Sequence, residues 1–290
     1  MRIAAFFHQG QAQVGLVSDD LQTVRVLDMP LADRELGALT LVDRLSRGEP
    51  LPAQGAALPL AEVQLRAPLP HPRRNIFCVG KNYHAHAQEF ARSGFDSSAK
   101  AGGEIPAEPI IFSKVPECVI ATGEAIEMPK VSTAIDYEAE LAVVIGKGGK
   151  GILKAEAMDH VWGYTIVNDV TARDWQNRHM QWHMGKSFDT FCPMGPWLVS
   201  ADTVDGTHTR VRCWVNGQER QNASTTDLIF DIPTLIETLS AGITLYPGDV
   251  IATGTPVGVG IGFTPPKYLT AGDVVRVEID GIGVLENPVK

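Results

Sequence analysis

The apolar positions along the chain predict a mostly β protein. Residues 139–146 (AELAVVIG) form an apolar run broken by one acid, as is typical of a buried strand. Residues 273–287 (DVVRVEIDGIGVLEN) contain an Asp-Gly turn between two strand-like stretches. Asn216 and Gly217, inside CWVNGQERQ, are the dipeptide that tight hairpins prefer. A short helix is expected at 231–242, where an aspartate can cap the first turn.

The beginning of the chain follows a different pattern. Residues 2–28 hold two apolar stretches around a polar turn, which predicts a small antiparallel pair, and residues 32–48 predict an amphipathic helix. The proline-rich stretch 65–74 forbids a regular helix and favours an extended linker. We therefore expect a small N-terminal α/β domain over 1–68 and a β-rich domain over 69–290, which makes the chain an α+β protein.

Charge and composition narrow the class of partner. The formal net charge is −9 and no basic patch is visible, which argues against binding of nucleic acid. The sequence has no apolar run of about 18 residues, so we expect no membrane partner and a cytoplasmic location. The cysteines form no CxxC pair, which argues against zinc and against a disulfide framework. A small molecule remains as the expected partner.

Acidic residues stand at the entrance of the buried strand. Strand alternation directs Asp136, Glu138 and Glu140 to one side, with Cβ atoms roughly 6 to 7 Å apart. Such a row is either a solvated face or a site for a cation. Asp169, at the end of another apolar run, can supply a third ligand beside Glu138 and Glu140. Ligands that are all carboxylates select a hard divalent cation, Mg²⁺ first and Mn²⁺ or Ca²⁺ next.

A histidine and a glutamate three residues apart form a candidate general base. His86 and Glu89 can meet if their segment is helical, and a carboxylate beside an imidazole raises its basicity. An exposed ion pair is the alternative, and by spacing His84 is as plausible as His86.

Cationic and hydroxyl side chains that could hold an anionic substrate occur in four other segments. Arg173 follows Asp169 by four residues, Lys186 lies in GKSFDT, and Lys114 ends the apolar run IIFSK. Thr255 lies in the glycine-rich TGTPVGVG, whose backbone N–H groups could bind an anion. Each of these residues taken singly could equally be an ordinary surface group.

A series of motifs in a fixed order resembles one known family. Taken together they are similar to the fumarylacetoacetate hydrolase family, over about residues 75 to 290. The stretches are GKNYHAHAQE, PIIFSK, DYEAELAVVIG, NDVTARDWQ, GKSFDTFCPMGPWLV and PGDVIATGTPVGVG. The resemblance implies a rolled mixed β-sheet domain, a homodimer and a Mg²⁺ or Mn²⁺ ion held by carboxylates.

The resemblance also assigns roles to single positions. It implies Glu138, Glu140 and Asp169 as metal ligands, and it leaves the role of Asp136 open. The catalytic pair it implies is His86 with Glu89, which selects His86 over His84. Positions that contact substrate in the family correspond here to Arg173, Gln176 and Lys186, and Thr255 matches the threonine of the TGT loop.

Our first hypothesis for the activity is hydrolysis of a C–C bond in a 2,4-dioxo acid of the acylpyruvate or fumarylpyruvate type. In this hypothesis His86 and Glu89 activate a water, and Lys186 helps to stabilise the enolate that leaves. The alternative at the same site is tautomerisation of oxaloacetate, isomerisation of a 2-hydroxydienoate or decarboxylation of an oxo acid. The stretches RDWQ and GKSFDTFCPMGP resemble the branch of the family that includes oxaloacetate tautomerase.

A third hypothesis, from another class, is a paralogue that binds metal and an oxo acid without turnover. Substrate choice is expected to depend on loops such as residues 91–104 (ARSGFDSSAKAGGE).

Overall fold

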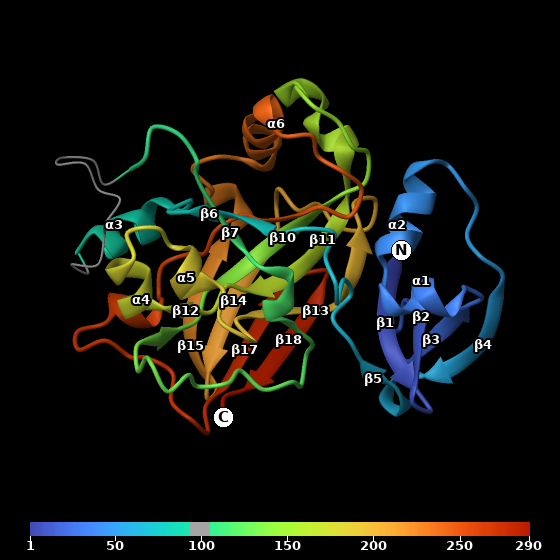
Figure 1. The fold of residues 1–290 in the computed structure, drawn as a ribbon, viewed down its shortest axis with the longest axis horizontal. Helices are drawn as coiled ribbons and strands as arrows, with labels where there is room; N and C mark the ends of the chain where they lie inside the picture. The colour runs from blue at the N-terminus through green and yellow to red at the C-terminus, as the bar shows by residue number, and fades with distance from the viewer. Residues whose placement is uncertain (93–104) are drawn as a thin grey trace.

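The computed structural model describes residues 1–92 and 105–290 of the chain, with a β-rich architecture (Figure 1). Most of the loop expected to govern substrate choice, residues 93–104, lies outside the described residues.

The main sheet is 12-stranded and mixed, and it runs through the whole molecule. Its order is β4 (Gln54–Pro59), β3 (Thr23–Leu27), β2 (Gln11–Val17), β1 (Arg2–His8), β13 (Cys192–Ser200), β11 (Val161–Asn168), β10 (Ala139–Ile145), β16 (Val250–Ala252), β6 (Ile76–Gly80) and β7 (Ile110–Lys114). Off this path, β5 (Gln64–Leu65) pairs with β1 and β8 (Val119–Ile120) pairs with β13. Strands β16 and β6 are parallel, as are β13 and β8, whereas the other pairs are antiparallel.

Two smaller sheets complete the β structure. A four-stranded sheet has the order β15 (Gln218–Ser224), β14 (Arg210–Val215), β17 (Val274–Ile279) and β18 (Gly283–Pro288). A two-stranded one joins β12 (Thr171–Ala172) to β9 (Ile135–Asp136). These sheets confirm the predicted β-rich α+β class.

Helices are short and lie at the borders of the sheets. They are α1 (Leu31–Glu35), α2 (Leu39–Ser46), α3 (His84–Arg92), α4 (Arg173–Arg178), α5 (His183–Lys186) and α6 (Ile232–Gly242). Single 3₁₀ turns are η1 (Leu60–Glu62), η2 (Pro116–Cys118), η4 (Thr225–Asp227) and η5 (Gly260–Gly262), and η3 (Lys154–His160) is longer. Asp231 caps α6 as expected, because its side chain accepts a hydrogen bond from the Thr234 N–H at 2.9 Å.

One expected helix is divided. The stretch 32–48 forms α1 and α2 with a break at Gly37, which has φ +64°. A side chain there would also approach the Pro68 carbonyl oxygen, since a Cβ on Gly37 would lie 2.5 Å from it. The break therefore lets the chain turn and pack closely against the proline-rich stretch.

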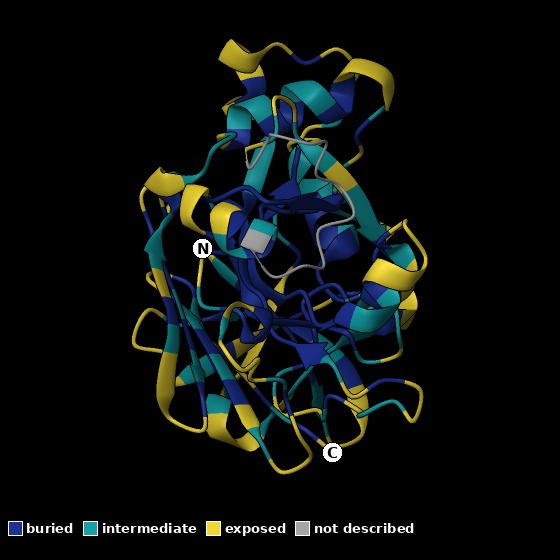
Figure 2. Cartoon of the chain, turned by 90° about the vertical axis from the view of Figure 1, so that its left-hand side faces the viewer, coloured by how far each residue is buried: buried dark blue, intermediate teal, exposed yellow. Residues whose placement is uncertain are grey.

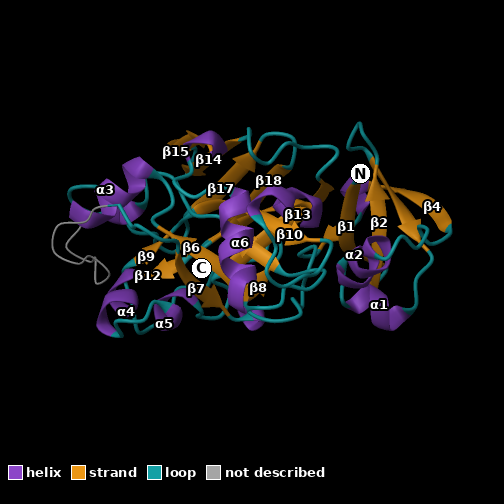
Figure 3. Cartoon of the chain, turned by 90° about the horizontal axis from the view of Figure 1, so that it is seen from above, coloured by secondary structure: helices purple, strands orange, loops and turns teal. Residues whose placement is uncertain are grey.

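The core lies where the central strands are covered on both faces. Every residue of β10 is buried, and so are eight of the nine residues of β13. Figure 2 shows buried residues gathered in the middle of the molecule. The N-terminal strands join this core through pairing of β1 with β13. Figures 1 and 3 place them at the end of the molecule opposite α3, α4 and α5. The division at residue 68 stays a prediction.

Candidate active site

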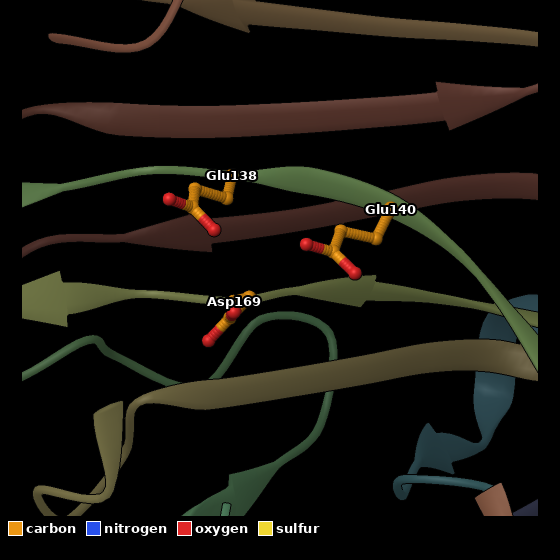
Figure 4. Close-up of side chains that lie close together, drawn as sticks. All are labelled: Glu138, Glu140 and Asp169. Atoms are coloured by element: carbon orange, nitrogen blue, oxygen red, sulfur yellow. The ribbon is translucent and has the colours of Figure 1, made fainter. Parts of the chain in front are cut away.

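Three buried carboxylates meet between neighbouring strands. Glu138 directly precedes β10, Glu140 is the second residue of β10, and Asp169 directly follows β11 (Figure 4). The antiparallel register pairs Ala139 with Asn168, so the start of one strand lies beside the end of the other. The candidate ligand atoms of the three acids lie within 4.8 Å of one another. Exposure is at most 4% for each residue, which argues against a solvated acidic face.

Burial and mutual repulsion act on these acids in different ways. Burial, together with the negative charges of Asp169 and Glu138, holds the pKa of Glu140 well above its usual range. Burial would also raise the pKa of Glu138, but the positive charges of Lys186 and Arg173 outweigh it and lower that pKa to about 2. Glu140 is thus the acid whose negative charge is least compensated by the protein.

Two buried lysines neutralise part of this charge. The Lys186 Nζ lies 2.7 Å from Glu138 Oε2 and 2.7 Å from Asp169 Oδ2. The Lys114 Nζ donates to Asp169 Oδ1 at 2.7 Å, to the Val170 carbonyl at 3.1 Å and to the Lys186 carbonyl. This geometry favours a role for Lys114 in holding Asp169 rather than in direct contact with a substrate.

The donor set fits a hard divalent cation. Four buried carboxylates in this network face three cations, which leaves one negative charge in excess: Asp136, Glu138, Glu140 and Asp169 against Lys114, Arg173 and Lys186. A divalent ion bound by oxygen atoms would compensate the repulsion that acts on Glu140. Glu138, Glu140 and Asp169 are the residues that could hold it.

Helix α3 brings the candidate base to the same cavity. His86 Nδ1 lies 3.1 Å from Glu89 Oε2, and the His86 side chain is only 5% exposed. A cavity-facing His86 therefore has its other ring nitrogen available for proton transfer. His84 is exposed and lines a different groove, so the structure separates the two histidines that spacing alone could not.

Asp136 stands outside the triad and supports Arg173 instead. The Arg173 Nε donates to Asp136 Oδ2 at 2.9 Å, and the Arg173 Nη1 donates to Gln176 Oε1 at 3.1 Å. Its Nη2 lies 2.7 Å from Glu138 Oε1 but makes no hydrogen bond of good geometry. This buried N–H group beside the triad is suited to a substrate carboxylate.

A glutamine that sequence reasoning missed contacts the threonine of the TGT loop. Gln221, buried on β15, donates through Nε2 to the Thr255 hydroxyl and to the Pro256 carbonyl, both at 2.7 Å. Its Oε1 accepts from the Ala139 N–H at 3.0 Å. Most residues of β15 are polar, so no alternation of apolar and polar residues in the sequence indicates that Gln221 is buried.

Aromatic side chains close the site. The cavity has a volume of about 10 Å³, room for about one water molecule. Phe90 and Phe112 each contact the Trp182 ring edge-on, and Trp182 packs so closely on Gly80 that a Cβ there would lie 2.2 Å from it. Lys81, also missed from the sequence, borders the cavity with φ +54°. The lining includes His86, Glu138, Glu140, Arg173, Gln176, Lys186 and Thr255.

The residues that form this site lie within a region that matches a known protein family. The family model described as fumarylacetoacetate (FAA) hydrolase C-terminal matches residues 75–290. The chain belongs to this family. The match covers the acidic triad, the His86 pair and both lysines, and it confirms the resemblance that the motifs carried.

Relatives extend over nearly the full length of the chain. Oxaloacetate tautomerase YisK of Bacillus subtilis is 44% identical over 299 residues, covering 95% of each chain. Among solved structures, a fumarylacetoacetate hydrolase from psychrophilic Exiguobacterium antarcticum is similar with a TM-score of 0.83 and 37% identity, covering 100% of this chain and 99% of that one. A 2-hydroxyhepta-2,4-diene-1,7-dioate isomerase from Mycobacterium marinum is similar with a TM-score of 0.79 and 34% identity, covering 100% of this chain and 98% of that one. The family thus includes enzymes of several reaction types.

Within the described residues, the structure has no helix that is both long and apolar enough to cross a bilayer.

Proposed function

We propose that the protein is a metal-dependent oxaloacetate tautomerase, which interconverts the keto and enol forms of this dicarboxylate. The observation that carries the proposal is that His86 lines the same cavity as Glu138 and Glu140, which form an acidic cluster with Asp169. The similarity to a tautomerase over 95% of the chain supports this reaction over the others such a site could perform. The C–C hydrolysis placed first from the sequence becomes the second candidate.

The side chains can perform this reaction without any further reactant. His86 takes a proton from C3 of the keto form, the C–H electron pair becomes the second bond between C2 and C3, and the π pair of the C2 carbonyl moves onto its oxygen. The oxygen at C2 then takes up a proton, so that atoms and charge balance. Glu89 keeps the His86 ring oriented, with its Oε2 at 3.1 Å from Nδ1.

The charged groups bind and polarise the substrate. Arg173 and Gln176, which hydrogen-bond to each other, would orient a carboxylate. Lys186 and the Thr255 hydroxyl border the cavity and would stabilise negative charge that develops on the C2 oxygen. A Mg²⁺ ion held by Glu138, Glu140 and Asp169, with Mn²⁺ or Ca²⁺ as alternatives, would supply Lewis-acid polarisation of the 2-oxo group.

The cavity is small, with a volume of about 10 Å³. Proton transfer needs no water in the cavity, and exclusion of water strengthens the charge interactions in it. Phe90, Phe112 and Trp182 line the cavity and would border a bound substrate. Helix α3 carries both the base and Phe90, and both side chains line the cavity.

Hydrolysis of an acylpyruvate is the second candidate, because the His86–Glu89 pair could equally activate a water. Similarity to the Exiguobacterium antarcticum hydrolase supports it. Decarboxylation and dienoate isomerisation would use the same charged groups. A protein that binds a 2-oxo acid without turnover is a third candidate, from a different class.

The test is to dilute the enol form of oxaloacetate into buffer and follow its ultraviolet absorbance with enzyme and Mg²⁺, with enzyme and a chelator, and without enzyme. A metal-dependent acceleration of ketonisation supports the proposal. Proton NMR of acetylpyruvate under the same conditions tests the second candidate, since hydrolysis yields acetate and pyruvate. Tight binding of a 2-oxo acid with neither reaction would instead support the third candidate.

The cytoplasmic location and the homodimer stay predictions.

A further inference from the structure

One glycine-rich turn contacts two carboxylates from different parts of the chain. The Gly258 N–H donates to both oxygens of Glu89, at 3.1 and 3.2 Å. Two residues later, the Gly260 N–H donates to Asp136 Oδ1 at 2.6 Å and the Ile261 N–H donates to Asp136 Oδ2 at 3.0 Å. Residues 258–262, called here the clamp turn, therefore bind Glu89 and Asp136 at once.

Each of these carboxylates holds a different functional side chain. Glu89 pairs with the His86 ring, and Asp136 pairs with the Arg173 Nε. Asp136 is fully buried, and it also accepts from the Tyr137 N–H at 2.9 Å. Together with the clamp turn and Arg173, this makes four donors for one carboxylate, which fills its ordinary acceptor capacity. Asp136 has no lone pair left over for a metal ion.

The clamp turn can approach Glu89 only because residue 262 has no side chain. A Cβ on Gly262 would lie 1.9 Å from Glu89 Oε1 and 2.2 Å from the carboxyl carbon. The backbone of Gly262 has no left-handed φ, so this close contact, rather than backbone strain, is what excludes a larger residue. The obstructing atoms form the end of a flexible side chain, so alanine would fit by displacing Glu89.

We infer that the clamp turn positions the two halves of the site separately: through Glu89 it orients the base His86, and through Asp136 it orients Arg173. Asp136 and Gly262 are then positioning residues, and Asp136 is not a metal ligand. This inference rests on the proposed function only in its kinetic tests, which measure turnover of oxaloacetate. It assigns a role to the acid that the family resemblance left open.

The two contacts predict different kinetic defects. In Asp136→Asn, the new amide NH2 group must face two N–H donors, either those of Gly260 and Tyr137 or those of Ile261 and Arg173. In both orientations hydrogen bonds are lost, so the Arg173 guanidinium is held less firmly. Substrate binding suffers, and we expect KM for oxaloacetate to rise about tenfold, with kcat changed less. In Gly262→Ala the base is misoriented, so we expect kcat to fall about 10- to 100-fold with KM nearly constant.

Matched controls separate these effects from loss of folding. Asp159→Asn makes the same chemical change at an exposed position, and Gly242→Ala adds a methyl group where no atom lies within 4 Å. Both controls should behave like wild type. Calorimetric Mg²⁺ affinity should be unchanged in Gly262→Ala and in both controls, and it should fall much less in Asp136→Asn than in Glu140→Gln. A loss in Asp136→Asn as large as that in Glu140→Gln would overturn its assignment as a residue that is not a ligand.

Two readouts do not need turnover, so they keep the inference testable if oxaloacetate is not the substrate. Binding of oxalate, an unreactive dianion resembling the 2-oxo acid end, to the Mg²⁺-loaded protein should weaken about tenfold in Asp136→Asn and stay constant in Gly262→Ala. Imidazole NMR signals of His86, assigned with His86→Ala, should shift in Gly262→Ala and not in Gly242→Ala. Unchanged oxalate affinity and unchanged His86 signals would overturn the inference, whereas wild-type inactivity alone would overturn only the proposed function.

Discussion

Gln221 on β15 donates a hydrogen bond to the Thr255 hydroxyl at 2.7 Å, across the boundary between the four-stranded sheet and the loop after β16. A hydroxyl that accepts this bond keeps its own proton for another acceptor. Because Thr255 lines the cavity, its proton is available to a substrate oxygen. The smaller sheet thus contributes to the site through Gln221, which contacts the cavity-lining Thr255.

Exchange of Gln221 for Glu tests this relationship. Glutamate keeps an acceptor for the Ala139 N–H but replaces the amide donor, so the Thr255 hydroxyl would turn toward it and away from the cavity. We expect kcat/KM for oxaloacetate to fall about tenfold, the worth of roughly one hydrogen bond of 1–1.5 kcal/mol. Gln218→Glu, at an exposed position of the same strand, is the control. Equal kinetics for the two variants would contradict the orientation of Thr255.

His86→Ala should abolish proton transfer but spare the metal site. A positioned general base contributes about 10²- to 10⁴-fold, so kcat for enol–keto exchange should fall by about that factor. Calorimetry should show unchanged Mg²⁺ affinity, because His86 is not among the clustered ligand atoms. His84→Ala, two residues away on the exposed side of α3, should retain wild-type rates. Turnover by His86→Ala at the wild-type rate would exclude this histidine as the base.

Glu140→Gln separates two effects of the triad: the destabilising repulsion between its carboxylates and their binding of Mg²⁺. The amide keeps an acceptor for the Gly254 N–H, 2.8 Å from Glu140 Oε2, but removes the like charge that Asp169 and Glu138 repel. We expect Mg²⁺ affinity to fall by at least about tenfold, while the metal-free protein unfolds at the same or a higher temperature. Consequently Mg²⁺ should raise the Tm less than in wild type, since stabilisation by a ligand follows its affinity.

Calorimetry and thermal unfolding with and without Mg²⁺ measure both effects. Glu156→Gln, an exposed control, should leave them unchanged. Undiminished Mg²⁺ affinity in Glu140→Gln would contradict the three-carboxylate site.

Local sequence patterns predicted the parts of the site that sit at strand ends. Glu138, Glu140 and Asp169 each adjoin an apolar run, and antiparallel pairing of such runs brings their ends together. The spacing of His86 and Glu89 likewise predicted a contact within one helix. Such features depend on one or two elements, so their periodicity is visible in the chain.

Contacts between distant segments left no such trace. Glu89 and Gly258 are separated by 169 positions, and Asp136 and Gly260 by 124, so no local period links them. Strand alternation predicted that Asp136 would lie beside the two glutamates. The strand is interrupted between β9 and β10, however, and Asp136 contacts Arg173 and the clamp turn instead. Gly37 divided an expected helix for a similar reason, its close approach to Pro68. Tertiary packing decided these cases.

Lys114→Met tests whether this buried lysine supports Asp169. Burial disfavours the charged ammonium, but Asp169 overcomes this and raises the pKa of Lys114 above its usual range, so the lysine is charged in the folded protein. Methionine fills similar space but leaves Asp169 with one fewer cation and the Val170 carbonyl with one fewer donor. Loss of one partner of a buried pair costs about 3–5 kcal/mol, so the Tm of the metal-free protein should fall clearly.

The metal should restore part of this loss. Removal of a positive charge beside Asp169 favours binding of a cation, so Mg²⁺ should bind Lys114→Met at least as tightly as wild type and stabilise it more. Denaturant unfolding with and without Mg²⁺, beside the exposed control Lys147→Met, measures the difference. A Lys114 that contacts only substrate would show the opposite pattern: unchanged stability of the free protein and a raised KM. If Lys114 supports the carboxylate cluster, Lys114→Met should therefore lose less stability relative to wild type with Mg²⁺ than without it.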